Sequence, residues 1–262
     1  MNLTTINYEV RDGVGHVRFA RAGAANAVNP VLARDLRQVM LAIEFDDAVK
    51  AVSVTAEGKV FCAGGDLKEF NKAGDGLPHL ASDMLVDFHG AIYHMNRMAK
   101  PVIAGVRGSA GGAGLSLVSA FDLVICGESA KFTMAYTRAG VTPDGTSTYF
   151  LARHIGLRRA MDLALTNRVL SASEAESWGL VNRVVPDDEV DDAAAKMAAE
   201  MAAGPAWALG HAKQIIYNGY ENSLEAAGEA EGAMIAKSMG THDGREGIAA
   251  FVERRTPDFQ GR

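Results

Sequence analysis

Hydrophobic and polar residues alternate with two different periods along the first part of the chain. Residues 15–20 place alternate apolar side chains on one face, which predicts a strand. Asn29 and Pro30 then mark a helix start, and apolar residues recur at helical spacing as far as Ile43. Residues 51–55 form a short apolar run of the kind that becomes a buried strand.

The same alternation continues through the middle of the chain. We expect a helix over 79–98, a strand over 101–106, a helix over 111–121 and a strand over 123–126. Strands separated by helices predict an α/β fold in which most strands pair in parallel.

The pattern changes near residue 187. From there to residue 255 the chain is rich in alanine, methionine and glutamate, and no strand pattern appears. Glycines and one proline divide this stretch into three or four helices. We therefore expect a core domain over 1–190 and a helical region over 191–262, whose apolar residues form either an internal core or a subunit interface.

Composition excludes several classes of protein. The chain has 262 residues, of which 48% are hydrophobic and 22% charged, and its formal charge is −6. A mildly acidic chain without a basic cluster is not expected to bind nucleic acid. Neither a run of about 20 apolar residues nor a secretory leader is evident, so we expect a cytoplasmic protein without a membrane partner. Cys62 and Cys126 are expected to be small buried hydrophobes, and no metal-ligand spacing occurs.

The first segment that could carry chemistry covers residues 60–70. A strand ends there, two glycines follow, and Asp66 opens a helix. Glycines allow a ligand to approach backbone amides closely, so the Gly65 amide could point into a cavity. The alternative is an ordinary strand-to-helix turn that Asp66 caps.

The second segment covers residues 104–116 and again runs from a strand through small residues into a helix. The amino end of a helix presents unpaired amides, which suit an anion or an oxyanion. No phosphate-binding Gly-Lys-Ser/Thr is present, and Leu117 stands where a dinucleotide fingerprint has its third glycine. A nicotinamide dehydrogenase is therefore disfavoured, whereas close packing of helix on sheet remains an alternative explanation of the small residues.

The third segment centres on Asp144, which follows a proline and precedes an apolar helix. Asp144 is either the cap of that helix or a general base in a partly apolar pocket. Two amides from separate strand ends could converge on one thioester oxygen and stabilise an enolate. One carboxylate added to them would complete a minimal site for that chemistry.

Together these segments resemble the crotonase (enoyl-CoA hydratase/isomerase) superfamily. Residues 61–68 and 108–114 are similar to its two oxyanion motifs, and 143–156 to the stretch that follows its second acidic site. Residues 173–186 and 246–259 resemble its later signatures, and Asn26-Ala27 its early one. The resemblance covers nearly the whole chain, and several motifs in order are more specific than any one.

The resemblance implies a ClpP-like spiral of ββα units with a C-terminal helical trimerisation region, assembled as a homotrimer or a hexamer. It implies an acyl-CoA substrate, whose coenzyme A is part of the substrate and not a separate cofactor. Gly65 and Ala113 would supply the oxyanion amides. The residues expected to contact the substrate are Ala24, Asn26, Ala27, Ala63, Asp66, Leu67, Gly112, Ser116 and Tyr136.

Departures from the family pattern favour one reaction over others. The two glutamates of the hydratases fall on Ser116 and Tyr136, neither of which is a carboxylate. Asp144 falls where Δ3-Δ2 enoyl-CoA isomerases and the phenylacetate ring-epoxide isomerase keep a single catalytic acid. The expected activity is therefore an enoyl-CoA isomerase in which Asp144 moves a proton from C2 to C4. The alternatives are hydration, thioester hydrolysis, ring rearrangement, and acyl-CoA binding without catalysis.

Overall fold

A six-stranded sheet organises the first two thirds of the chain in the computed structural model, which describes residues 1–261. Its strands, in spatial order, are β1 (Ile6–Arg11), β2 (Val14–Phe19), β3 (Ala51–Ala56), β4 (Val102–Val106), β6 (Leu123–Gly127) and β9 (Arg183–Val185). Every neighbouring pair is parallel except β1 and β2, which form a hairpin. The predicted parallel pairing is confirmed, as are the strands expected near 15–20, 51–55, 101–106 and 123–126.

A second, three-stranded sheet contains β5 (Ser109–Gly111), β7 (Lys131–Thr133) and β8 (Leu170–Ser171). Cys62 extends it through a parallel bridge to Ala110. The chain thus passes from a strand of the first sheet to a strand of the second and then into a helix, as in β4, β5 and α4 (Ala113–Ala120). This is the expected ββα unit. The helix starts at Ala113 rather than at residue 111 because Ser109 to Gly111 pair with β7.

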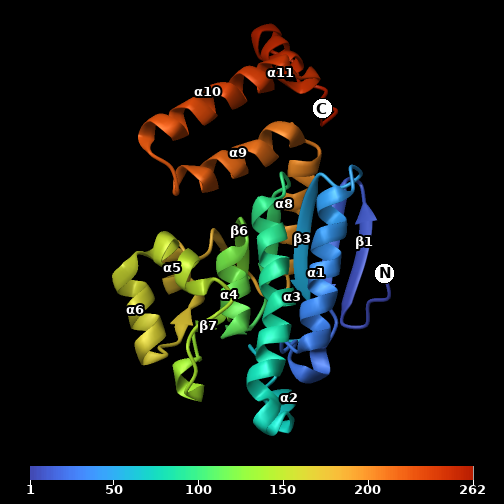
Figure 1. Cartoon of the computed structure of the whole chain (residues 1–262). Helices are drawn as coiled ribbons and strands as arrows, with labels where there is room; N and C mark the ends of the chain where they lie inside the picture. Colours follow the sequence, from blue (N-terminus) through green and yellow to red (C-terminus); the bar gives the residue numbers. More distant parts are fainter. Residues whose placement is uncertain (262) are drawn as a thin grey trace.

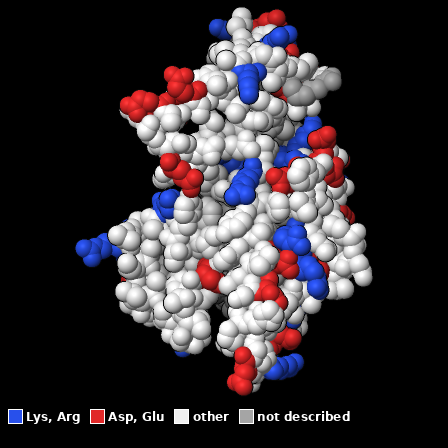
Figure 2. Space-filling model, viewed as in Figure 1, with Lys and Arg blue, Asp and Glu red and all other residues white. Residues whose placement is uncertain are grey.

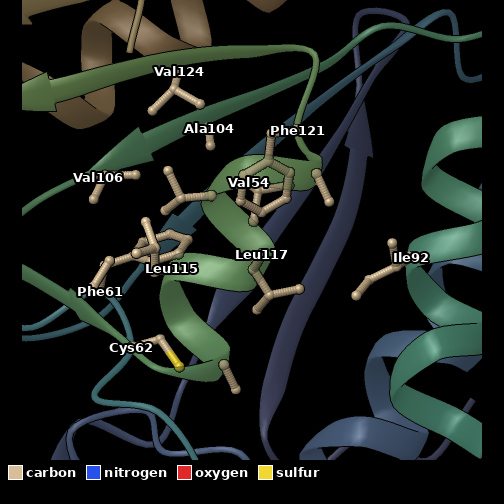
Figure 3. Close-up of a cluster of buried hydrophobic side chains, with 14 of the residues drawn as sticks. Val54, Phe61, Cys62, Ile92, Ala104, Val106, Leu115, Leu117, Phe121 and Val124 are labelled. Atoms are coloured by element: carbon tan, nitrogen blue, oxygen red, sulfur yellow. The ribbon is translucent and has the colours of Figure 1, made fainter. Parts of the chain in front are cut away.

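Two long helices, α1 (Pro30–Phe45) and α3 (Leu77–Arg97), pack together in front of the large sheet (Figure 1). The Asn29 side chain accepts the Leu32 amide at 2.9 Å, so the predicted cap of α1 is confirmed. Helix α4 lies inside the protein, where Leu115, Leu117 and Phe121 pack among side chains of both sheets and α3 (Figure 3). This core holds the amino end of α4 rigidly in place.

Helix α8 (Val190–Ala202) covers the opposite face of the large sheet. Its Ala194 and Ala198 are fully buried against Val14, Ala51 and Ile103. The helix with which the predicted C-terminal region begins therefore packs on the core sheet, and the division at residue 190 stays a prediction. Small alanine side chains allow the close contact between helix and sheet.

The remaining helices are α2 (Leu67–Lys72), α5 (Ser147–Ile155), α6 (Leu157–Thr166), α7 (Ala172–Trp178), α9 (Ala206–Gly219), α10 (Leu224–Gly240) and α11 (His242–Glu253). Helices α8 to α11 confirm the expectation of three or four helices after residue 187. Helices α9, α10 and α11 extend beyond one end of the sheet (Figure 1).

A buried ion pair joins α9 to the core. The Lys213 ammonium lies 2.8 Å from the Asp122 carboxylate and also donates to the carbonyls of Lys100, at 3.0 Å, and Met95. The Tyr217 hydroxyl donates to the second Asp122 oxygen at 3.1 Å. Burial raises the pKa of Asp122 and lowers the pKa of Lys213, and each charge partly offsets the effect on the other. Each ion therefore depends on its partner.

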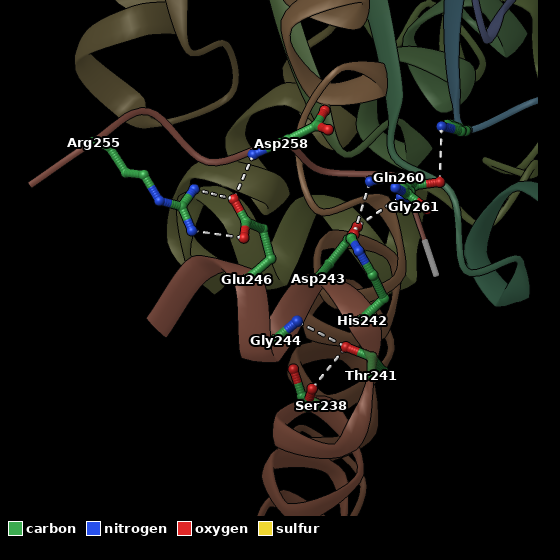
Figure 4. Close-up of polar contacts among 11 residues, drawn as sticks. Ser238, Thr241, His242, Asp243, Gly244, Glu246, Arg255, Asp258, Gln260 and Gly261 are labelled. Carbon is green, nitrogen blue, oxygen red and sulfur yellow. Dashed lines mark hydrogen bonds and ion pairs between the residues drawn. The ribbon is translucent and has the colours of Figure 1, made fainter. Parts of the chain in front are cut away.

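The end of the chain folds back onto α11 (Figure 4). Asp243 accepts the amides of Gln260 and Gly261 at 2.7 and 2.6 Å. The Arg255 guanidinium binds both oxygens of Glu246 and lowers the pKa of that carboxyl to about 2. These contacts give the C-terminal segment a defined path along α11.

Within residues 1–261, no helix is long and apolar enough to cross a membrane. The same residues contain no cluster of three or more metal-ligating side chains. Charged side chains on the face shown in Figure 2 lie in small scattered groups, with broad uncharged areas between them.

The Asp122–Lys213 pair gives a stability prediction. Lys213→Met keeps the length of the side chain but leaves the Asp122 charge buried without its partner, so the free energy of unfolding should fall by about 3–5 kcal/mol. The exposed Lys237→Met serves as control and should change it by less than about 0.5 kcal/mol. Urea unfolding measures both, and equal effects of the two substitutions would contradict a stabilising role for the pair.

Candidate active site

The segment after β3 lies directly against the segment before α4. The Cys62 amide donates to the Ser109 carbonyl at 3.2 Å, and the Gly111 amide donates back to the Cys62 carbonyl at 3.0 Å. A β-carbon on Gly64, whose φ is +114°, would lie 3.0 Å from the Gly111 carbonyl oxygen. One on Gly112 would lie 3.6 Å from the Gly64 α-carbon. Only glycine allows the two backbones to approach this closely.

Each of these touching glycines precedes an amide that was predicted as an oxyanion donor. The Val28 amide donates to the Gly64 carbonyl at 2.7 Å, and the Asp66 amide donates to the Val28 carbonyl at 2.8 Å. The Gly65 amide between them takes no part in this parallel bridge. Ala113 is the first residue of α4, so its amide has no carbonyl within the helix. Neither amide donates a hydrogen bond to another of residues 1–261. Both remain available to an oxygen atom of a ligand.

A loop before α1 runs alongside the first glycine segment. The Ala63 amide donates to the Ala25 carbonyl at 3.0 Å, which brings together the predicted contacts Ala24, Ala27, Ala63 and Leu67. The Leu67 side chain is largely exposed beside them. These residues form a mostly apolar strip next to the free amides.

Asn26 supports this loop from inside. Its side chain is fully buried and donates to the carbonyls of Glu57 at 2.9 Å and Val60 at 2.8 Å, while its oxygen accepts the Arg21 amide at 2.9 Å. Its polar atoms are therefore engaged by backbone, and any contribution of Asn26 to ligand binding comes through the shape of the loop.

Asp66 caps α2 and forms an ion pair, while its predicted contact with the substrate stays a prediction. One oxygen accepts the Glu69 amide at 3.2 Å, which confirms it as the cap of α2. The other oxygen pairs with Arg21 at 3.0 Å, and despite partial burial these contacts lower the pKa of Asp66. Because Arg21 also donates to the Ala27 carbonyl, this ion pair ties the loop to the glycine segment.

Asp144 does not cap α5. The cap position belongs to Thr146, and both Gly145 and Thr146 have a φ of +60°. This left-handed turn directs the Asp144 carboxylate away from the helix, where it accepts a hydrogen bond from the Tyr136 hydroxyl. The interpretation of Asp144 as a helix cap is therefore wrong, because the turn separates its side chain from the first amides of α5.

Ser116 and Tyr136 meet beside Asp144. The Ser116 hydroxyl lies 2.8 Å from the Tyr136 hydroxyl and 2.9 Å from the Asp144 carbonyl oxygen. Burial, and then the Asp144 charge, raise the pKa of Tyr136. A β-carbon on Gly112 would lie 3.9 Å from the Tyr136 ring, so this polar cluster adjoins the amino end of α4.

The family model for enoyl-CoA hydratase/isomerase matches residues 9–262. The chain belongs to this family. The resemblance to the crotonase superfamily, and the fold that it implied, are thereby confirmed.

Relatives within the family carry the names of different reactions. The chain is 34% identical to 1,2-epoxyphenylacetyl-CoA isomerase of Escherichia coli K12, with 97% of each chain covered. It is 36% identical to a 4-chlorobenzoyl coenzyme A dehalogenase of Arthrobacter, with 94% of this chain and 90% of the relative covered. The crystal structure of an enoyl-CoA hydratase from Polaromonas superposes with a TM-score of 0.93 at 30% identity, covering 97% of this chain and 99% of the other. Family membership therefore leaves several acyl-CoA reactions possible.

His89 is a site residue that the sequence did not reveal. Its Nε2 accepts the Gly145 amide at 3.2 Å, directly after Asp144. This histidine lies within the helix expected over 79–98, and nothing in the sequence pattern distinguishes it from other helical residues. Phe88, which precedes His89, is buried against Gly145, but only the fold places that part of α3 beside the Asp144 turn.

Cys62 adjoins the site without offering a nucleophile. Burial raises the pKa of its thiol to about 12, and burial does the same for Cys126. Both cysteines are buried and free, as the sequence predicted. A neutral thiol is a weak nucleophile, so neither cysteine is a candidate catalytic group.

The Asp144 turn gives the second prediction. A β-carbon on Gly145 would lie 2.7 Å from that of Ser116 and 2.8 Å from the Phe88 ring. Gly145→Ala should therefore add an overpacking cost of about 1–3 kcal/mol to the backbone cost of a left-handed residue, about 1–2 kcal/mol. Gly140 also has a positive φ but no atom near its β-carbon position, so Gly140→Ala should show the backbone cost alone. Equal losses in urea unfolding would contradict the packing seen at Gly145.

Proposed function

We propose that this protein is an enoyl-CoA isomerase that uses Asp144 as its single acid–base group. The observation that carries the proposal is the Asp144 carboxylate, turned away from α5 towards a cluster that adjoins the amino end of α4. The free amides of Gly65 and Ala113 lie on the same two glycine segments. Isomerisation requires one oxyanion site and one proton carrier, and the chain provides both.

In the proposed reaction the thioester oxygen of a 3-enoyl-CoA accepts the amides of Gly65 and Ala113. Asp144 removes a proton from C2, and the electron pair moves into the thioester, so that negative charge develops on the oxygen between the two amides. The C3–C4 double bond then takes up the proton at C4 as the C2–C3 double bond forms. Each amide donor in such a site is typically worth about 2.7–4 kcal/mol. The proton that leaves C2 is the one returned at C4, so no other reactant is needed.

The apolar strip beside the amides is the proposed path of coenzyme A. It carries Ala24, Ala27, Ala63 and Leu67, and the ion pair between Arg21 and Asp66 holds its two segments together. Binding of the remote coenzyme A moiety would fix the thioester against the amides, which is how binding energy away from the reacting atoms contributes to catalysis.

Hydration is less well supported by these residues. Addition of water requires groups that hold the water and move its proton. Ser116 and Tyr136, at the positions predicted for the hydratase glutamates, hydrogen-bond to each other at 2.8 Å. Because burial and the Asp144 charge raise the pKa of Tyr136, that side chain remains a neutral donor.

A second candidate is dehalogenation of 4-chlorobenzoyl-CoA, the activity in the name of the Arthrobacter relative, in which a nucleophile would displace chloride from the ring. Attack of a nucleophile on a 4-chlorobenzoyl ring delivers negative charge to the thioester oxygen, so it would use the same amides. The observation in its favour is the His89 imidazole beside the Asp144 turn, a second titratable group that a one-base isomerisation does not need. Chloride release from 4-chlorobenzoyl-CoA tests this candidate.

We also propose that the chain assembles as a homotrimer or as a hexamer of two trimers. No residue of α10 is buried, and Leu224 and Phe251 are 85% and 87% exposed. Apolar side chains concentrated on outer helices are typical of an interface.

The assembly prediction concerns Phe251. Phe251→Glu introduces a charge that would be buried between subunits, so multi-angle light scattering should show the trimer or hexamer mass of the protein reduced towards a 27.7 kDa monomer. Val86→Glu, at an exposed position on α3, should leave the mass unchanged. A monomeric unsubstituted protein would contradict the proposal.

The catalytic prediction concerns Asp144. Asp144→Asn preserves shape but cannot accept the C2 proton, so conversion of 3-enoyl-CoA to conjugated 2-enoyl-CoA, followed by ultraviolet absorbance, should slow about 100- to 10,000-fold. Asp188→Asn, at an exposed position outside the site, is the matched control and should retain the native rate.

Two results would count against the isomerase. Full activity of Asp144→Asn would remove Asp144 as the base. No conversion by the unsubstituted protein of 3-enoyl-CoA substrates of several chain lengths would remove the reaction itself, and chloride release in its place would favour the second candidate.

A further inference from the structure

The Asp144 carboxylate receives one hydrogen bond from within residues 1–261, and the donor is the Tyr136 hydroxyl. The same residues form no ion pair with Asp144. A carboxylate without a cationic partner depends on such a donor for stabilisation and for orientation. The Tyr136 contact reaches only Oδ1, so Oδ2 is left for the substrate.

The backbone holds Tyr136 in place for this contact. Ala135 has a φ of +53°, which turns the chain sharply after β7. The Tyr136 carbonyl then accepts the amides of Ala139 at 2.9 Å and Val141 at 3.2 Å. The ring therefore projects from a closed turn next to Gly112, where little freedom remains for it to swing away.

Counting hydroxyl protons gives the direction of the hydrogen bonds. An ionised carboxylate can only accept, so the single Tyr136 proton goes to Asp144. Ser116 has one proton as well, and its possible acceptors are the Tyr136 oxygen at 2.8 Å, the Asp144 carbonyl at 2.9 Å and the Gly112 carbonyl at 3.3 Å. In each of these arrangements the Tyr136 proton goes to Asp144.

Two other titratable side chains, Cys62 and His89, lie near this cluster, and they come from different elements. The Cys62 thiol is buried and neutral at ordinary pH, because burial raises its pKa to about 12. The Nε2 of His89 on α3 is occupied by the Gly145 amide. Neither contributes a positive charge or a hydrogen bond to the carboxylate.

We propose that Tyr136 is a positioning residue that, supported by Ser116, holds the Asp144 carboxylate as an anion with one oxygen directed to the acyl group. This inference rests on the proposed isomerase activity. Ser116 and Tyr136 would then position the carboxylate and not simply line the acyl pocket. The pair keeps one carboxylate ready to remove a proton and return it.

Tyr136→Phe tests the inference, because it removes the hydroxyl and keeps the ring. Loss of a hydrogen bond to a charged group, typically about 1.5–3 kcal/mol, corresponds to a fall in kcat of about 10- to 150-fold with KM little changed. Ser116→Ala, which leaves the Tyr136 contact in place, should show smaller changes of the same sign.

Tyr149→Phe is the matched control. The Tyr149 hydroxyl also donates to a carboxylate, that of Glu221 at 2.7 Å, but at an exposed position outside the site. Its removal should leave kcat and KM unchanged. Native kcat in a folded Tyr136→Phe would overturn the proposal.

A measurement without substrate separates this inference from the proposed function. Ultraviolet resonance Raman spectroscopy of tyrosine, compared between variants with and without Tyr136→Phe, isolates the hydrogen bonding of the Tyr136 hydroxyl. Because this hydroxyl donates to the Asp144 carboxylate, Asp144→Asn, which replaces a charged acceptor by a neutral amide, should change the ring doublet of Tyr136. An unchanged doublet would overturn the proposed contact. A changed doublet in a protein that converts no 3-enoyl-CoA would support the contact and reject only the isomerase.

Discussion

The candidate site depends on the close approach of two backbone segments at Gly64 and Gly112. Their reciprocal hydrogen bonds, through Cys62 and Gly111, fasten the end of one strand to the start of a buried helix. A side chain on Gly64 would press on the Gly111 carbonyl, and the two segments would have to separate. The amides of Gly65 and Ala113 follow these glycines, so the contact between backbones fixes where the two donors lie. Amides held by the fold need no rearrangement when charge develops on a ligand oxygen.

The elements around this contact form a rigid scaffold for the side chains of the candidate site. Helix α4 is buried along its length, and α8 closes the sheet on the other side with alanines. The Asp122–Lys213 pair and the folded C-terminal segment connect the outer helices to that core. The Asp144 carboxylate, in contrast, lies on a turn, where Gly145 permits an approach to Ser116 that no other residue would allow. The relatives carry the names of different reactions, so the fold itself does not determine the reaction.

Local sequence predicted those features that local interactions determine. Asn29 capped the expected helix, and apolar runs gave the central strands. Strand β1 is absent from the predicted elements, although Asp12-Gly13 between two alternating segments is a recognised hairpin signal. The packing of α8 on the large sheet could not be predicted, because an alanine-rich helix gives no sign of which surface it covers. The position of Asp144 before an apolar helix is typical of a helix cap. Two successive left-handed residues, however, separate it from α5. Only the packing at Gly145 accounts for that turn. The contact of Tyr136 with Asp144 and the approach of His89 join distant segments, so periodicity and composition carry no information about them.

The proposed chemistry depends on polarisation of a bound thioester by the amides of Gly65 and Ala113. Infrared spectroscopy of an acyl-CoA labelled with ¹³C at the thioester carbonyl tests this polarisation without any turnover. The carbonyl stretch should move to lower frequency on binding, in the protein and in Asp144→Asn alike, because two backbone donors withdraw electrons from that oxygen. A bound acyl-CoA whose carbonyl stretch stays at its solution frequency would contradict the proposed role of the two amides.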